Sequence, residues 1–145
     1  MDIMEIVIRA GAAVLAGAAL GLNRDLHGKP TGIRTLALVG LGSAVAVVAV
    51  SDSHDVSAVS RVIQGILTGI GFLGAGVIIR NNEGRQIHGL TTAACAWLTA
   101  CIGVTCGAGE WRIVLVSMVL AFLVLIVGGP LEKALHSRLS QPHDD

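Results

Sequence analysis

The polar residues that could bind an ion or an anion are concentrated in one short connector between two apolar stretches. They are Asn23, Arg24, Asp25, Lys29, Arg34 and Thr35. Arg34 lies about one turn inside the apolar stretch that follows, where a cation needs a counter-ion or a phosphate. Asp25 is the carboxylate expected to pair with it. The alternative is a solvated connector whose cations contact lipid headgroups.

A second group of polar residues lies within apolar stretches or near their ends: Glu5, Arg9, Arg61, Gln64, Thr91 and Thr92. Arg9 follows Glu5 by four residues, a spacing that allows an ion pair on one face of a helix. Its long side chain can also carry the charge to the membrane surface. The alternative is a partner on another helix, such as Asp52 or Asp55.

The sequence lacks the residue patterns of catalysis and of resident metal sites. It contains no HExxH motif, no Walker loop and no recognisable nucleophile with its base. Three cysteines, Cys95, Cys101 and Cys106, share one apolar stretch, but helical geometry keeps them from forming a common site. We therefore expect no enzymatic activity, no cofactor and no metal centre.

The composition is that of a chain dissolved in lipid. Of its 145 residues, 53% are hydrophobic and 14% are charged, and the mean hydropathy is +0.76. Lys and Arg number 10 and Asp and Glu number 10, so the formal net charge is zero. Without a basic field to neutralise phosphates, no nucleic-acid partner is expected, and membrane lipid is the expected surrounding.

Apolar stretches long enough to cross a bilayer occur five times, which predicts an all-α, polytopic bundle of five transmembrane helices. The predicted spans are 3–22, 33–50, 62–79, 90–106 and 111–128. Residues 1–130 form one transmembrane domain in this prediction, and 131–145 form a short cytoplasmic tail. Gly128-Gly129-Pro130 is expected to end the fifth span.

The distribution of basic residues predicts the orientation of the chain, because short cytoplasmic loops are enriched in Lys and Arg. One side of the membrane holds Arg24, Lys29, Arg34, Arg80, Arg85, Lys133 and Arg138, and the other holds Arg9, Arg61 and Arg112. The N-terminus is therefore expected outside and the C-terminus in the cytoplasm.

Small residues mark the faces through which membrane helices pack. The expected packing residues are Gly65, Gly69, Gly71, Gly74 and Gly76 of the third span and Ala96, Thr99 and Gly103 of the fourth. We expect these spans to form an antiparallel pair, with the third-span glycines facing a stripe that begins at Thr92. The fifth span, almost entirely Val, Leu, Ile and Met, should be the most lipid-exposed. An unwound third helix that coordinates an ion or substrate is the alternative.

Three ordered blocks of sequence resemble the MgtC/SapB family of membrane proteins. The first runs from Gly21-Leu22-Asn23-Arg24-Asp25 to Lys29-Pro30-Thr31-Gly32-Ile33-Arg34-Thr35. The second contains Arg61, Gln64-Gly65 and Gly69-Ile70-Gly71-Phe72-Leu73-Gly74-Ala75-Gly76. The third is His88-Gly89-Leu90-Thr91-Thr92-Ala93-Ala94 with Trp97.

The resemblance implies a five-helix protein of the bacterial inner membrane that is linked to growth or survival at low magnesium. It further implies regulatory contacts with other membrane machinery, notably the F-type ATP synthase. Two departures accompany it. Asn23 stands where the family usually has Glu, and the chain is expected to be a membrane domain alone, without the soluble C-terminal regulatory domain of longer members.

Two functions follow as alternatives. The first is a regulatory protein that acts through helix contacts with a partner complex. The second is a transporter or channel for Mg²⁺ or another small solute, although a hard cation prefers several oxygen ligands and the spans offer mainly Thr hydroxyls and backbone carbonyls. Small-residue faces also predict a homodimer or larger homo-oligomer.

Overall fold

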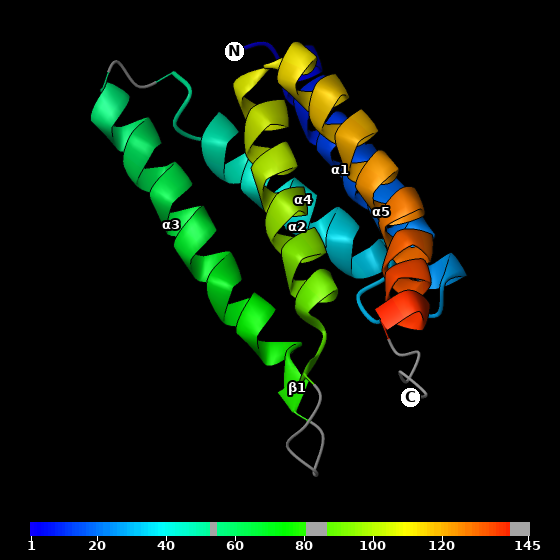
Figure 1. Cartoon of the computed structure of the whole chain (residues 1–145). Coiled ribbons are helices and arrows are strands. Elements are labelled where there is room, and N and C mark those ends of the chain that lie inside the picture. Colours follow the sequence, from blue (N-terminus) through cyan, green and yellow to red (C-terminus); the bar gives the residue numbers. More distant parts are fainter. Residues whose placement is uncertain (53–54, 81–86, 140–145) are drawn as a thin grey trace, which may run out of the picture.

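A computed structural model describes residues 1–52, 55–80 and 87–139 of the chain. The elements are α1 (Ile3–Leu26), α2 (Ile33–Val48), α3 (Val56–Gly76), β1 (Ile79–Arg80), β2 (Ile87–His88), α4 (Leu90–Ala108) and α5 (Trp111–Leu139). The five helices run back and forth as a bundle, so the N-terminus and the end of α5 lie at opposite ends of it (Figure 1).

The predicted class, an all-helical membrane bundle, is confirmed. Among the described residues, α1, α3, α4 and α5 are long and apolar enough to cross a bilayer. The remaining helix, α2, is apolar but has only 16 residues, or about 24 Å of helix axis. β1 and β2 form a two-residue antiparallel pair, Ile79 with His88 and Arg80 with Ile87, in the connector between α3 and α4.

Several predicted boundaries were wrong because capping interactions and tertiary packing, rather than hydropathy, set the helix ends. α3 begins six residues earlier than predicted, since the Asp55 carboxylate accepts the backbone N–H of Ser57 at 2.9 Å and caps the helix. α5 continues through Pro130 to Leu139, so the expected stop at Gly128-Gly129-Pro130 is wrong. Proline removes one backbone donor, which a membrane helix tolerates. Of the predicted tail, residues 140–145 lie outside the described residues.

The core is built mainly from α1, α2 and α4, and Ile70 of α3 and Val114 and Ala121 of α5 complete it. α4 is the most buried of the four long helices, with over half of its apolar window buried, against 6% in α3 and 11% in α5. Backbone meets backbone at several glycines: Gly40 packs against the Ala13 carbonyl, Gly103 against the Gly40 carbonyl, and Gly107 against the Ala44 carbonyl. These contacts explain the burial of α4, because helices that lack a Cβ at the crossing can approach most closely.

The predicted partner of the α4 stripe was wrong. α3 and α4 are antiparallel neighbours, as expected. Yet Thr92 contacts Arg24 of α1, and Thr99 and Gly103 contact Gly40 of α2. The stripe, including the buried Ala96, therefore belongs to the α1–α2–α4 core, where glycines on α2 provide the close approach.

The third-span glycines have little part in packing within this chain. An ideal Cβ at Gly65, Gly69, Gly71 or Gly76 would meet no described atom within 4 Å, while one at Gly74 would lie 3.5 Å from the Cβ of Ala93. α3 is also less buried than α5, so the fifth span is not the most exposed one. α3 is one continuous helix, which excludes the unwound alternative for this structure.

We expect Gly107→Ala to destabilise the bundle by about 1–3 kcal/mol, because the added carbon would lie 2.7 Å from the Ala44 carbonyl oxygen. Gly71→Ala is the matched control, since it adds helix propensity worth up to about 1 kcal/mol in open space. Denaturant titration of the purified protein in detergent measures both free energies of unfolding. Equal decreases in the free energy of unfolding of the two variants would contradict the assignment of the core.

Candidate functional site

Two guanidinium groups of α1 reach into the bundle at its opposite ends and contact α4. Arg24, in the last turn of α1, is 5% exposed, and its Nη2 donates to the Thr92 hydroxyl in the first turn of α4. Its Nε has no hydrogen-bond partner among the described residues. A buried cation of this kind is costly unless every donor is satisfied, so this contact fixes Arg24 without fully compensating it.

Arg9 forms the corresponding contact at the other end. Its Nη1 donates to the carbonyl of Gly107 at 2.7 Å, and its Nη2 pairs with Glu5, as the spacing predicted. The carbonyls in the last turn of a helix carry partial negative charge, which favours a cation there. The alternative of a partner on another helix is thus also realised, but by α4 rather than by Asp52 or Asp55.

The polar residues of the connector between α1 and α2 have different structural roles. Asp25 accepts the backbone N–H of Ile33 at 3.0 Å and lies against Gly32, where an added Cβ would collide with its carboxylate. It thereby caps α2, whose own N-cap residue has no side chain to do so. The predicted Asp25–Arg34 ion pair is wrong: in the part of the chain that the structure describes, no carboxylate pairs with Arg34.

The other residues of the predicted set are not brought together with Arg24. Asn23 offers its backbone carbonyl to the His27 ring at 2.7 Å. Lys29, Arg34, Thr35 and Thr91 are exposed. The cluster is therefore no single site: Arg24 and Thr92 face the core, Asp25 caps a helix, and Arg34 and Thr35 face outward on α2.

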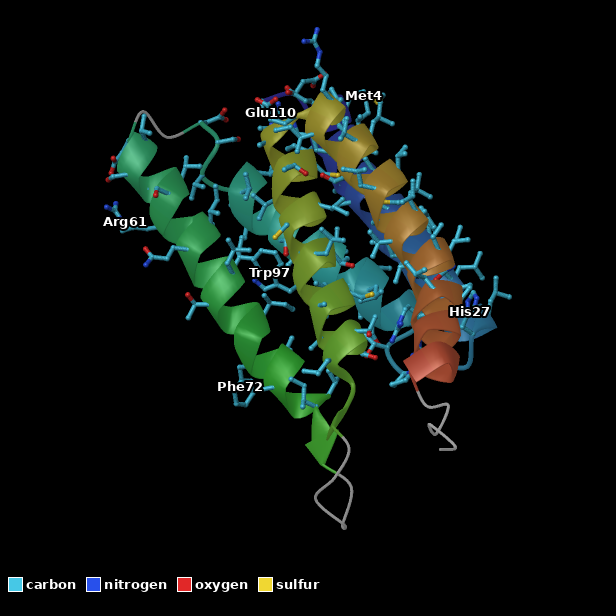
Figure 2. The ribbon with its side chains drawn as sticks, in the orientation of Figure 1. Met4, His27, Arg61, Phe72, Trp97 and Glu110 are labelled. Atoms are coloured by element: carbon cyan, nitrogen blue, oxygen red, sulfur yellow. The ribbon has the colours of Figure 1, made fainter. Side chains whose placement is uncertain are left out.

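α3 carries a polar and small-residue face that points away from the bundle. Figure 2 shows Arg61 and Phe72 directed away from the other helices. Ser60, Gln64, Thr68, Gly71 and Ala75 are exposed at helical spacing on the same side. We call these five residues the α3 outer face. Gln64 has no hydrogen-bond partner among the described side chains.

Sequence reasoning singled out Gln64 and Gly71 but missed the face to which they belong. The signal was present in the spacing of Ser60, Gln64 and Thr68, four residues apart, with Gly71 and Ala75 continuing the row. Arg61, at its edge, donates to the Ser57 hydroxyl at 2.8 Å and to Asp55 at 3.2 Å. Hydrogen bonds from Ser57, followed by the one from Arg61, hold the pKa of Asp55 below its usual value.

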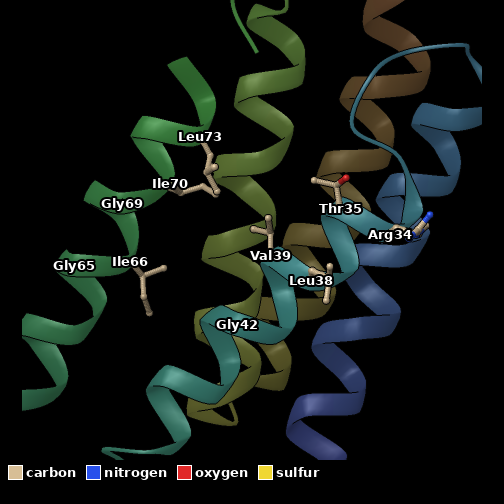
Figure 3. A pocket seen from close by; sticks show the side chains of 10 residues that line it. All are labelled: Arg34, Thr35, Leu38, Val39, Gly42, Gly65, Ile66, Gly69, Ile70 and Leu73. Carbon is tan, nitrogen blue, oxygen red and sulfur yellow. The ribbon is translucent and has the colours of Figure 1, made fainter. Parts of the chain in front are cut away.

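A groove separates α2 from the opposite side of α3, with a volume of about 640 Å³. The α2 wall includes Arg34, Thr35, Leu38 and Val39, and the α3 wall includes Gly65, Ile66, Gly69 and Leu73. In Figure 3, Ile66 and Leu73 reach from α3 toward α2, while the Arg34 guanidinium turns outward at the rim. The groove is thus apolar along its length and cationic at one end.

A smaller cavity of about 380 Å³ lies near the N-terminus and is lined in part by Glu5, Arg9, Ser51 and Asp52. Its carboxylates are engaged, because Glu5 pairs with Arg9, and Asp52 accepts from the N-terminal amine at 3.1 Å. Among the described residues, no group of three or more His, Cys, Asp or Glu side chains is placed to hold a metal ion.

The apolar helices, the glycine-packed core and the polar contacts at its ends define a multi-pass α-helical membrane protein. The model of the MgtC family matches residues 11–134. The chain belongs to the MgtC family.

Relatives of known name support this assignment. SrpB of Synechococcus elongatus is 40% identical over 86% of this chain and 75% of its own length. YhiD of Escherichia coli strain K12, which is named provisionally as a magnesium transporter, is 38% identical over 85% of this chain. MgtC of Salmonella typhimurium is 42% identical over 90% of it. The matched region spans 60% of YhiD and 53% of MgtC. No solved structure gives a significant match.

We expect Arg24 and Thr92 to be energetically coupled. Thr92→Val should destabilise the wild-type protein because it leaves the buried guanidinium without its acceptor, whereas in an Arg24→Met background the same change should cost little. A double-mutant cycle on the free energy of unfolding in detergent should give a coupling of about 1–3 kcal/mol. A coupling near zero would show that the contact does not stabilise the fold.

Proposed function

We propose that this chain is a membrane-embedded regulatory protein linked to magnesium homeostasis, and that it acts by contact with another membrane protein rather than by catalysis. Membership of the MgtC family and the name of YhiD support the link to magnesium. The excess of basic residues at the connector and tail ends supports an N-terminus outside and a C-terminus in the cytoplasm of a bacterial inner membrane.

The observation that carries the proposal is Gln64 on the α3 outer face, which is exposed and has no hydrogen-bond partner among the described residues. Transfer of an amide from water to cyclohexane, where it finds no hydrogen-bond partner, costs about 4–8 kcal/mol. A helix of another protein can remove that cost by offering a polar side chain. Gly71 and Ala75 leave the backbone of α3 accessible, so such a helix could approach closely.

Two features weigh against the alternative of a Mg²⁺ path through the bundle. A hard cation takes six or more oxygen ligands, whereas the interior contains the guanidinium groups of Arg9 and Arg24 near its two ends. These charges repel a divalent cation.

A flux measurement separates the two functions. The transporter alternative predicts Mg²⁺ flux into liposomes that contain the purified protein, and the regulatory function predicts no flux above that of protein-free controls.

Co-purification from native membranes in mild detergent tests the contact, with the F-type ATP synthase as the first candidate partner. We expect Gln64→Leu to lower recovery of the partner about three- to tenfold, the range for one interhelical hydrogen bond. Gly71→Leu should lower it further, because a bulky side chain would separate the helices.

Gly69→Leu is the matched control, because it adds the same side chain to α3 on the groove side, where an added Cβ also meets open space. It should recover the partner as the wild type does. A contact with the ATP synthase through the α3 outer face would be refuted if the wild type and the three variants all recovered equal amounts of that complex. It would also be refuted if none of the four proteins recovered it.

A further inference from the structure

The groove between α2 and α3 lies on a different side of α3 from the outer face. Its walls are mainly Leu, Ile and Val side chains with glycines at Gly65 and Gly69, and it remains open because no side chain of the described residues fills the space beside those glycines. A volume of about 640 Å³ falls within the range of about 300–1,000 Å³ that ligand sites occupy.

Arg34 gives the groove a charge at one end only. It is exposed, pairs with no described carboxylate, and lies in the first turn of α2. In Figure 3 its guanidinium points away from α3 at the rim, while Thr35, Leu38 and Val39 continue the α2 wall. A ligand that fits this layout has an anionic head and an apolar tail.

The length and lining of the groove fit an acyl chain. Arg34 and Gly42 are eight residues apart on α2, or about 12 Å along the helix axis. An acyl chain can follow the apolar walls over that length while its headgroup stays at the Arg34 end.

We propose that this groove binds an anionic phospholipid, with the phosphate at Arg34 and an acyl chain between Leu38 and Val39 of α2 and Ile66 and Leu73 of α3. The guanidinium group favours phosphate because it presents several N–H donors in a planar array. The charge makes the site selective for anionic headgroups over zwitterionic ones, and the groove confines the binding to one position on the protein.

The test uses the purified full chain in nanodiscs that contain equal amounts of phosphatidylglycerol and phosphatidylcholine. Native mass spectrometry then counts the lipids that stay bound to the protein after it is released from the nanodisc. We expect the wild type to retain phosphatidylglycerol about fivefold over phosphatidylcholine, the preference that one interfacial cation confers. Arg34→Ala should remove the preference. Gly69→Leu should lower retention of both lipids, because its side chain would occupy the groove.

Two control variants separate this site from general effects of charge and size. Lys29→Ala removes one cation from the same connector but does not line the groove, and Gly71→Leu adds the same bulk on the opposite side of α3. Both should bind lipid as the wild type does. An unchanged preference in Arg34→Ala, or equal losses in the variants and their controls, would overturn the proposal. Neither result depends on recovery of a protein partner.

Discussion

The structure depends on the contact between the backbones of α2 and α4. In lipid, apolar side chains gain little by leaving their surroundings for a neighbouring helix, so close approach and complementary shape have to hold the helices together. Gly40 meets this requirement twice, since it packs against the Ala13 carbonyl and its own carbonyl packs against Gly103. α1, α2 and α4 consequently form one core, while α3 and α5 lie against its outside.

The polar contacts reinforce the same core. α1 is fastened to α4 at both ends, by Arg24 on the Thr92 hydroxyl and by Arg9 on the Gly107 carbonyl. These contacts place the two guanidinium groups about four turns apart along α1, near opposite ends of the bundle. They add to the packing of α1 on α2, where Gly17 lies against the Leu36 carbonyl and Gly21 against the backbone at Ile33.

The five apolar helices and the helical class could be predicted from the sequence, although not every boundary, because an apolar stretch of sufficient length has few other folds in lipid. The Glu5–Arg9 pair could also be predicted, since both residues lie on one helix. The partners of the glycine rows could not. A row such as Gly65 and Gly69 indicates how close a neighbour can come, but not which neighbour comes, and here that row borders a groove while Gly40 and Gly103 form the crossing.

The interior hydroxyls show why a regulatory contact agrees with this structure better than an ion path. Ser43 donates to the Val39 carbonyl at 2.9 Å, and Thr99 donates to the Cys95 carbonyl at 2.7 Å, so both serve their own helices. Thr92 accepts from Arg24. A cation entering the core would have to displace that guanidinium and still lack carboxylate ligands among the described residues. Gln64 on α3 and Arg34 on α2, which have no side-chain partner among the described residues, both lie on the outside of the bundle, where a second molecule can reach them.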